Sequence, residues 1–245
     1  MERIIVNKIS KQFKIGTRKK MSTLSRILSF FSGKEQTRIL QALDKVSFKA
    51  YGKETLGIIG DNGSGKSTLL RIIAKIYNKD NGEIKTNGKI IPLINLKLGL
   101  NPRLTMEDNI YLICSILGLS KKQIKEKFES IAKFSDLKEF INTKIYQFSE
   151  GMKQKLVFSI AIHCNPEILL LDEIFEVGDE NFKIKSAAKI KELVKQGATT
   201  ILVSHDISLI KKHCHRVLWM KNGKLKKQGK TSEIIREYLK YEKRR

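Results

Sequence analysis

The stretch Gly60-Asp61-Asn62-Gly63-Ser64-Gly65-Lys66-Ser67 follows the pattern G-x-x-x-x-G-K-S. The run Thr55–Ile59 before it predicts a strand, and the apolar run Leu69–Tyr77 after it predicts a helix. Glycines at these positions let backbone N–H groups converge on an anion, and the start of a helix adds the positive end of its dipole. Lys66 supplies a full charge to the β- and γ-phosphates, and Ser67 supplies a hydroxyl for Mg²⁺. The stretch therefore predicts a nucleotide-binding phosphate loop.

A second polar site is predicted where another apolar run, Ile168–Leu171, ends in Asp172 and Glu173. In an open α/β sheet, ligands bind at the carboxyl ends of the strands. Asp172 is expected to hold Mg²⁺ through water, and Glu173 to polarise the attacking water as a general base. A solvated acidic turn is the alternative interpretation, and the phosphate loop elsewhere in the chain favours the catalytic one.

The remaining pattern predicts an α/β fold with a β-rich flank and a helical insertion. Short apolar runs such as Thr200–Val203 suit the strands of a buried parallel sheet. Further strands are predicted at residues 4–15 and 46–49, and in hairpins that turn at Asn222-Gly223 and over residues 81–88. Helices are predicted over residues 105–144, where Ser120 and Gln123 make a capping box, and over residues 232–241.

Composition restricts the class of protein. The chain has 245 residues, of which 41% are hydrophobic, so it is long enough for one large domain. No apolar run reaches the roughly 18 residues that a membrane span needs, and no leader peptide is visible. Cys114, Cys164 and Cys214 form no metal-binding spacing and are expected to be buried thiols in a reducing compartment.

The net charge of +23 is concentrated at the two ends of the chain. Residues 1–40 hold ten basic and two acidic residues, and residues 211–245 hold thirteen basic and three acidic residues. Such a charge attracts nucleic acid, anionic lipid or acidic solutes. A generally lysine-rich composition is the alternative explanation. His163, His213 and His215 show no site pattern and are expected to be structural or surface residues.

The order of the motifs resembles that of the ATP-binding cassette (ABC) ATPases over about residues 1–230. Phe148-Ser149-Glu150-Gly151-Met152 resembles the family's signature, and Asp172-Glu173 resembles its Walker B aspartate and catalytic glutamate. Val177-Gly178-Asp179 stands where the D-loop lies, and Ser204-His205-Asp206 contains the switch histidine. The resemblance assigns ATP binding to Phe13, which would stack on adenine, and to Gly60, Asp61, Asn62, Gly63, Ser64, Gly65, Lys66, Ser67 and Thr68.

The resemblance also implies a head-to-tail homodimer with two ATP molecules between facing subunits. Ser149 and Gly151, with the rest of the signature, would contact the γ-phosphate of the partner's nucleotide, and Asp179 would join them. Glu173 and His205 are the catalytic residues that it implies, and Ser67 and Asp172 the Mg²⁺ ligands.

Two departures from the usual pattern point to one branch of the family. The expected glutamine before the helical insertion is missing from residues 95–102, where Asn95 is its substitute, and Glu150 and Met152 replace commoner signature residues. With the insert before Val46, these features resemble ATPases that export teichoic acids, O-antigens and capsular polymers. A soluble cassette ATPase acting on nucleic acid or ribosomes is the competing class, which the absence of an aromatic-interleaved basic strand disfavours. A nucleotide-regulated module without turnover is a third, disfavoured by Glu173.

The expected organisation is a nucleotide-binding domain over residues 1–230 and a basic helix over residues 231–245. The domain contains a helical subdomain at about residues 98–160 and a basic insert at residues 17–40. The insert's apolar residues Leu24, Ile27, Leu28 and Phe31 have the spacing of an amphipathic helix for the membrane surface or the membrane subunit, or for packing on the domain itself. The resemblance implies an integral membrane permease as partner, a lipid-linked polysaccharide as transported substrate and a peripheral position at the cytoplasmic face of the membrane. An anionic membrane surface is an additional possible partner, and nucleic acid is not expected as a partner.

Overall fold

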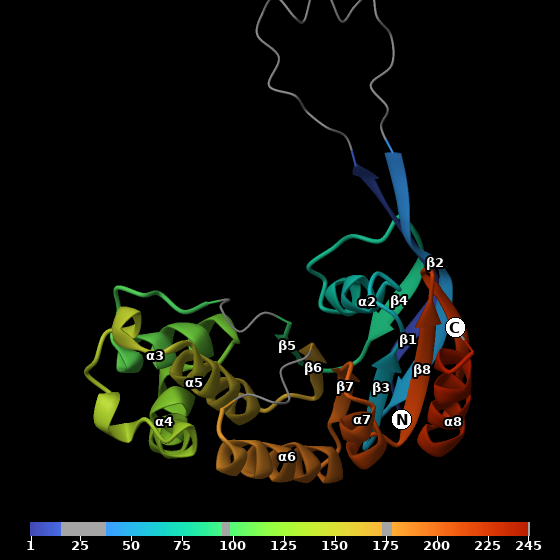
Figure 1. Ribbon diagram of the computed structural model, residues 1–245. Coiled ribbons are helices and arrows are strands. Elements are labelled where there is room, and N and C mark those ends of the chain that lie inside the picture. The colour runs from blue at the N-terminus through green and yellow to red at the C-terminus, as the bar shows by residue number, and fades with distance from the viewer. Residues whose placement is uncertain (16–37, 95–98, 173–177, 245) are drawn as a thin grey trace, which may run out of the picture.

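The strand before the phosphate loop, β3 (Thr55–Ile59), lies in the middle of a six-stranded sheet (Figure 1). The computed structural model describes residues 1–15, 38–94, 99–172 and 178–244. The strand order is β5-β6-β7-β3-β8-β9, with parallel pairs throughout except that β9 runs antiparallel to β8. The other strands of this sheet are β5 (Ile90–Leu93), β6 (Ile168–Asp172), β7 (Thr199–Val203), β8 (Arg216–Lys221) and β9 (Lys224–Lys230). All residues of β3 and β7 are buried, which confirms the predicted parallel sheet.

The register of the parallel strands brings three strand ends to one edge of this sheet. Ile58 of β3 pairs with Val203 of β7, and Val203 pairs with Asp172 of β6. The phosphate loop, Asp172 and the segment after Val203 therefore leave the sheet beside one another. This is the edge where an open α/β sheet binds its ligands.

A smaller antiparallel sheet covers one face of the larger one. It consists of β1 (Glu2–Ile15), β2 (Arg38–Tyr51) and β4 (Asn81–Thr86), with β1 in the middle. Helix α2 (Lys66–Ile73) packs between the two sheets, and its Leu70 lies in a core with Ile4 of the small sheet and Leu170 of the large one. Burial on alternate faces of β6 sends Leu170 to this core and Leu171 to the opposite one.

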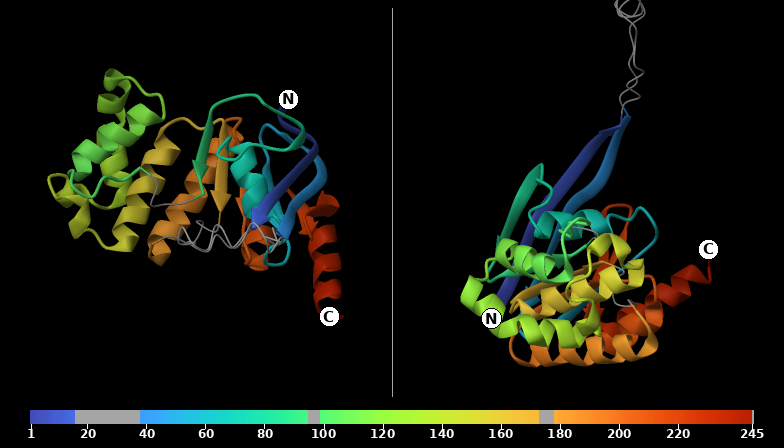
Figure 2. Two further views of the ribbon diagram at one scale, coloured as in Figure 1. Left: turned by 90° about the horizontal axis from the view of Figure 1, so that it is seen from above. Right: turned by 90° about the vertical axis from the view of Figure 1, so that its left-hand side faces the viewer.

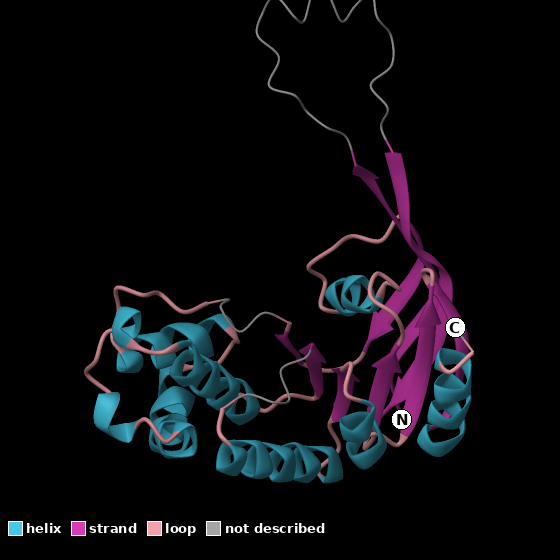
Figure 3. Ribbon diagram, in the orientation of Figure 1, coloured by secondary structure: helices cyan, strands magenta, loops and turns pink. Residues whose placement is uncertain are grey.

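Helices cover the opposite face of the large sheet (Figure 3). They are α6 (Glu180–Lys195), α7 (Ile207–His213) and α8 (Thr231–Glu242). Helix α5 (Glu150–His163) joins the same core from one side. The final helix α8 is fixed by its aromatic side chains, since Tyr238 and Tyr241 lie 5.4 and 5.3 Å from the ring of Trp219 in β8. The two faces of one sheet thus belong to different cores.

A helical unit stands to one side of the sheets (Figure 2). It contains α3 (Met106–Ile116), α4 (Lys121–Ser135), α5 and two short 3-10 helices, Lys138–Phe140 and Ile145–Gln147. Thr105 with Asp108 begins α3 and Ser120 with Gln123 begins α4, each in a capping box. The second of these boxes was predicted from the sequence.

Several predicted elements have different bounds in the structure. The expected hairpin over residues 81–88 is wrong, because β4 pairs with β1 in the small sheet whereas β5 pairs with β6 in the large one. The helix predicted to reach Tyr77 ends at Ile73, since Lys75 adopts a left-handed turn with φ +60°. Residues 105–144 hold two helices separated at Gly118, where φ is +83°. Residues 38–40, assigned to the basic insert, belong to β2. The insert's apolar stripe, Leu24, Ile27, Leu28 and Phe31, lies outside the described residues.

The prediction that the cysteines are buried thiols was confirmed. Cys114, Cys164 and Cys214 are buried and free. Within the ranges that the structure describes, no helix combines the length and the apolar character needed to cross a bilayer.

Phe182 of α6 should be a major source of stability for the helical side of the molecule. Its ring is fully buried and packs edge-on against Phe134 and Phe158, at 5.7 and 5.8 Å. Phe182→Ala should lower the free energy of unfolding by about 3–5 kcal/mol in urea titrations, because it leaves a cavity. The control Ile184→Ala, on the same helix and 62% exposed, should change it by less than about 0.5 kcal/mol. Equal effects of the two substitutions would show that the ring is not a core group.

Candidate nucleotide site

The phosphate loop is shaped by its own backbone and by Lys66. The Lys66 ammonium donates hydrogen bonds to the carbonyl oxygens of Gly60 and Asp61, at 2.8 and 2.9 Å. This folds the lysine side chain over the loop and places its charge at the concave side. Within the described residues, the buried hydroxyl of Ser64 has no hydrogen-bond partner, so the middle of the loop offers an unused donor.

Two glycines let other backbone segments press against the loop. Gly60 has φ +145°, and a Cβ there would lie 2.1 Å from the carbonyl oxygen of Met220. Gly65 has φ +99°, and a Cβ there would lie 2.5 Å from the carbonyl oxygen of Ala42. Side chains at these positions would displace the backbone of β8 or β2, so the pattern of glycines is a packing requirement as well as a phosphate-binding one.

A pocket of about 260 Å³ gathers most of the predicted nucleotide residues. Its lining includes Phe13 of β1, His205 after β7, and the loop residues Asn62, Gly63, Gly65, Lys66, Ser67 and Thr68. Phe13 is half-buried, and its ring meets Tyr77 edge-on at 5.7 Å. His205 is held by a turn in which the backbone N–H of Asp206 donates to the Ser204 hydroxyl at 3.0 Å. Residues far apart in the sequence thus meet at the edge of the sheet.

Ser67 and Asp172 are the described residues that fit a divalent cation. The Ser67 hydroxyl lies 3.4 Å from a carboxylate oxygen of Asp172, so two oxygen donors converge beside the phosphate loop. Mg²⁺ is commonly bound through one or two protein oxygens, with phosphate and water completing its octahedral shell. No group of three or more His, Cys, Asp or Glu side chains suited to a metal occurs among the residues described.

The signature residues lie on a different element, at the start of α5. Ser149 is the N-cap, and its hydroxyl accepts a hydrogen bond from the Met152 N–H at 3.1 Å. Ser149 and Glu150 are exposed, whereas Phe148 is buried and packs against Phe140 at 6.1 Å. The lining of the nucleotide pocket includes none of these described residues. The Phe148 side chain therefore anchors the turn, while the exposed groups after it face outward.

Comparisons with known proteins agree with this arrangement of motifs. The sequence profile of the family described as "ABC transporter" matches residues 43–176. The chain belongs to the ABC transporter family. This is the family to which the order of the motifs pointed.

Its relatives include two export proteins. The chain is 42% identical over 219 residues to the teichoic acids export ATP-binding protein TagH of Enterococcus faecalis, covering 89% of this chain and 48% of that protein. It is 37% identical over 243 residues to the O-antigen export system ATP-binding protein RfbB of Myxococcus xanthus, covering 97% of this chain and 56% of that protein. The chain thus spans about half the length of these relatives. A solved structure titled "Structure of ATP binding subunit of ABC transporter" has the same fold, with a TM-score of 0.76 and 22% identity over 96% of this chain and 93% of that one.

Lys155 is a residue near the signature to which the sequence analysis gave no role. It lies on α5 and forms an ion pair with Asp179, the N-cap of α6. Its side chain passes over Gly178, where a Cβ would come 2.9 Å from the Lys155 Cε, and its ammonium lies 5.4 Å from the ring centre of Phe182. The signature helix and the D-loop residue are therefore joined by a charge pair within one chain.

Two predicted residues of the site lie outside the described residues. These are Glu173, the expected general base, and Asn95, the expected substitute for the missing glutamine. Their roles stay predictions.

The Lys155–Asp179 pair should be visible in the titration of Asp179. Hydrogen bonds from Lys155 and from the Phe182 N–H lower the pKa of Asp179 to about 2. This pKa lies below that of an aspartate in the unfolded chain. Ionised Asp179 therefore contributes to the stability of the fold above about pH 4, and the contribution is lost as the pH falls toward 2. The side chain is exposed, so this contribution is small.

Carboxyl-carbon NMR should therefore show an ionised Asp179 at pH 3. Lys155→Gln should raise the pKa of Asp179, because it removes the larger of the two causes. Lys183→Gln, which removes the charge of a lysine on α6, should leave the pKa of Asp179 unchanged. An unchanged titration in Lys155→Gln would contradict the pairing.

Proposed function

We propose that the chain hydrolyses ATP and thereby drives an exporter of a lipid-linked surface polysaccharide or teichoic acid. The observation that carries the ATPase part is the single pocket that collects the phosphate loop, Phe13 and His205, with the Ser67–Asp172 oxygen pair beside it. The export part is supported by relatives named for O-antigen and teichoic acid export. The same names give no support to the alternative of a cassette ATPase acting on nucleic acid or ribosomes.

Within one subunit, each group near the pocket has a distinct role in this proposal. The loop from Gly60 to Thr68 and the Lys66 charge hold the phosphates, and Phe13 stacks on the adenine. His205 contacts the γ-phosphate, and Glu173 orients the attacking water. Ser67 and Asp172 would hold Mg²⁺, which would supply positive charge beside the phosphate oxygens. The protein's contribution is positioning and charge stabilisation, as is usual for phosphoryl transfer.

The signature is proposed to act across a head-to-tail homodimer. Ser149, Glu150, Gly151 and Met152 begin a 14-residue helix, whose N-terminus favours an anion, and Ser149 and Glu150 are exposed. A subunit that already has its own phosphate loop would present this second anion site to its partner's nucleotide. Asp179 would approach the same interface. Closure and reopening of the dimer would move an integral membrane permease.

The proposed location is the cytoplasmic face of the cell membrane, as a peripheral subunit bound to that permease. Residues 1–230 would form the nucleotide-binding domain, with the basic helix after them. The insert, without the residues 38–40 that belong to β2, would contact the membrane surface or the permease, where anionic lipid attracts its basic residues.

Lys66→Ala tests the nucleotide site. The substitution removes the charge that lies over the loop, so ATP affinity measured by calorimetry should fall by about 10- to 100-fold. Lys79→Ala, at an exposed lysine beyond α2, should bind ATP like the unaltered chain. If Lys66→Ala binds ATP with unchanged affinity, the pocket is not the nucleotide site.

Ser149→Arg tests the action across the dimer. ATP affinity of the monomer should stay unchanged, because Ser149 lies outside its own pocket, while phosphate release should fall to background. The matched control is Ser120→Arg, which removes the N-cap of α4 in the same way and should keep its hydrolysis rate. Loss of monomer affinity in Ser149→Arg would contradict the assignment, as would equal loss of hydrolysis in both variants.

A further inference from the structure

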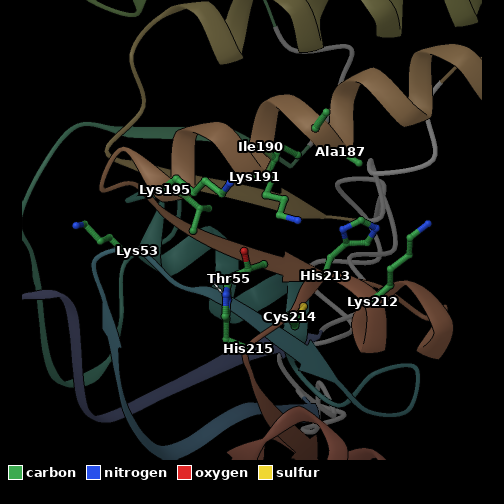
Figure 4. Close-up of a pocket in the computed structure, with 12 residues that line it drawn as sticks. Lys53, Thr55, Ala187, Ile190, Lys191, Lys195, Lys212, His213, Cys214 and His215 are labelled. Atoms are coloured by element: carbon green, nitrogen blue, oxygen red, sulfur yellow. Dashed lines mark hydrogen bonds between the residues drawn. The ribbon is translucent and has the colours of Figure 1, made fainter.

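A basic cavity lies at the edge of the large sheet opposite the nucleotide pocket. It has a volume of about 720 Å³ and opens between α6, α7 and the starts of β3 and β8 (Figure 4). The nucleotide pocket follows the carboxyl end of β3, whereas this cavity is lined by Thr55 at the strand's amino end. The two sites therefore do not share the phosphate loop.

Positive side chains surround this cavity. Lys191 and Lys195 line it from α6, Lys212 and His213 from α7, and Lys53 and His215 from the segments before β3 and β8. The ammonium groups of Lys53 and Lys212 point outward at its two ends (Figure 4). No carboxylate occurs in its lining among the residues that the structure describes. The nearest acidic side chains in sequence are engaged elsewhere, since Glu54 pairs with Arg216 at 3.3 Å and Glu192 with Lys189 at 2.9 Å.

The lysines of the cavity differ from other lysines of α6. Lys183, Lys185 and Lys189 each have a carboxylate partner, in Glu180, Asp136 and Glu192 respectively. Within the described part of the chain, none of the four cavity lysines, Lys53, Lys191, Lys195 and Lys212, forms an ion pair. The ammonium groups of Lys191 and Lys195, side by side on α6, create a positive potential that an anion would neutralise.

His215 adds a hydrogen-bond donor to the cavity, and His213 reports the positive potential there. The backbone N–H of Thr55 donates to Nδ1 of His215 at 3.0 Å, so the neutral ring carries its proton on Nε2 and has a donor to offer. Burial lowers the pKa of His213, and the charges of Lys212 and Lys191 lower it further. An anion in the cavity would oppose the effect of these charges and raise that pKa.

The volume of the cavity and the apolar part of its wall indicate which kind of anion it can hold. The volume lies within the roughly 300–1,000 Å³ of small-molecule sites. The apolar side chains of Ile190 and Val194 form part of the wall, so the space suits a ligand with an apolar group as well as charge. We propose that this cavity binds a small ligand bearing two or more phosphate groups, as a free metabolite or as the head of a lipid. Such a site is separate from the proposed ATPase activity and does not depend on it.

The chain's four histidines allow both sites to be observed in one NMR experiment. Imidazole signals of the full chain, assigned by single His→Gln variants, would be followed while tripolyphosphate is added. His213 and His215 should shift saturably and the pKa of His213 should rise, His163 should stay in place, and His205 would report any binding at the phosphate loop separately.

A charge-matched pair of variants then tests the lysines. Lys191→Gln with Lys195→Gln should weaken the binding seen at His213 by at least about tenfold. Lys122→Gln with Lys125→Gln removes the same charge from exposed positions of α4 and should leave the binding unchanged. Absence of a saturable shift at His213 and His215, or equal affinities in the two double variants, would overturn the proposal.

Two further probes identify the source of the anion. Vesicles of phosphatidylcholine containing phosphatidylinositol bisphosphate that compete with tripolyphosphate, when plain phosphatidylcholine vesicles do not, would support a lipid head group. Failure of both vesicles to compete would support a free phosphate compound. A poly-glutamate peptide that moves the same signals at lower concentration than tripolyphosphate would overturn the phosphate assignment in favour of an acidic protein segment.

Discussion

The phosphate loop keeps its shape because backbone from two other parts of the chain touches it where a side chain would not fit. The carbonyl oxygens of Met220 and Ala42 occupy the positions that Cβ atoms of Gly60 and Gly65 would need. Hydrogen bonds close the contact, since Gly223 donates to Ser64 at 3.1 Å and Asp44 donates to Gly223 at 2.8 Å. The small sheet, the last hairpin and the loop are thereby fastened at one point. The positions of Phe13, Lys66 and the strand ends around the pocket all follow from this junction.

A second junction connects the helical unit to the sheet. Helix α5 carries the exposed signature at its start and packs Phe158 against Phe182 of α6 further along. Lys155 lies between these points and pairs with Asp179. A displacement of α5 therefore changes the surroundings of the D-loop residue in the same chain. The signature and the D-loop residue, both proposed to face a partner subunit, are thus connected through contacts within a single chain.

The sequence was most informative where one local pattern determines the outcome. The fully apolar strands β3, β6 and β7, the turn at Asn222-Gly223 and the capping box at Ser120 were predicted correctly because each depends on neighbouring residues. The hairpin over residues 81–88 was wrong because turn residues do not specify which sheet a strand joins. Lys155 was missed because its partner lies 24 residues away, on another helix. The basic cavity was missed for the same reason, since its lysines are spread from Lys53 to Lys212, and His213 and His215 were interpreted as structural or surface residues.

The strand order has a consequence for how the protein is made. The three strands of the small sheet all lie within the first 86 residues. They are therefore synthesised early and can pair with one another before the rest of the chain is made. The strand β3 cannot form its sheet pairs at that stage, because its neighbours β7 and β8 begin only at Thr199 and Arg216. At roughly 5–20 residues per second, about 8–30 s separate synthesis of the phosphate loop from synthesis of the end of β8. Until β7 is synthesised, the strand β3 lacks both partners, and an unpaired apolar strand in the nascent chain favours aggregation.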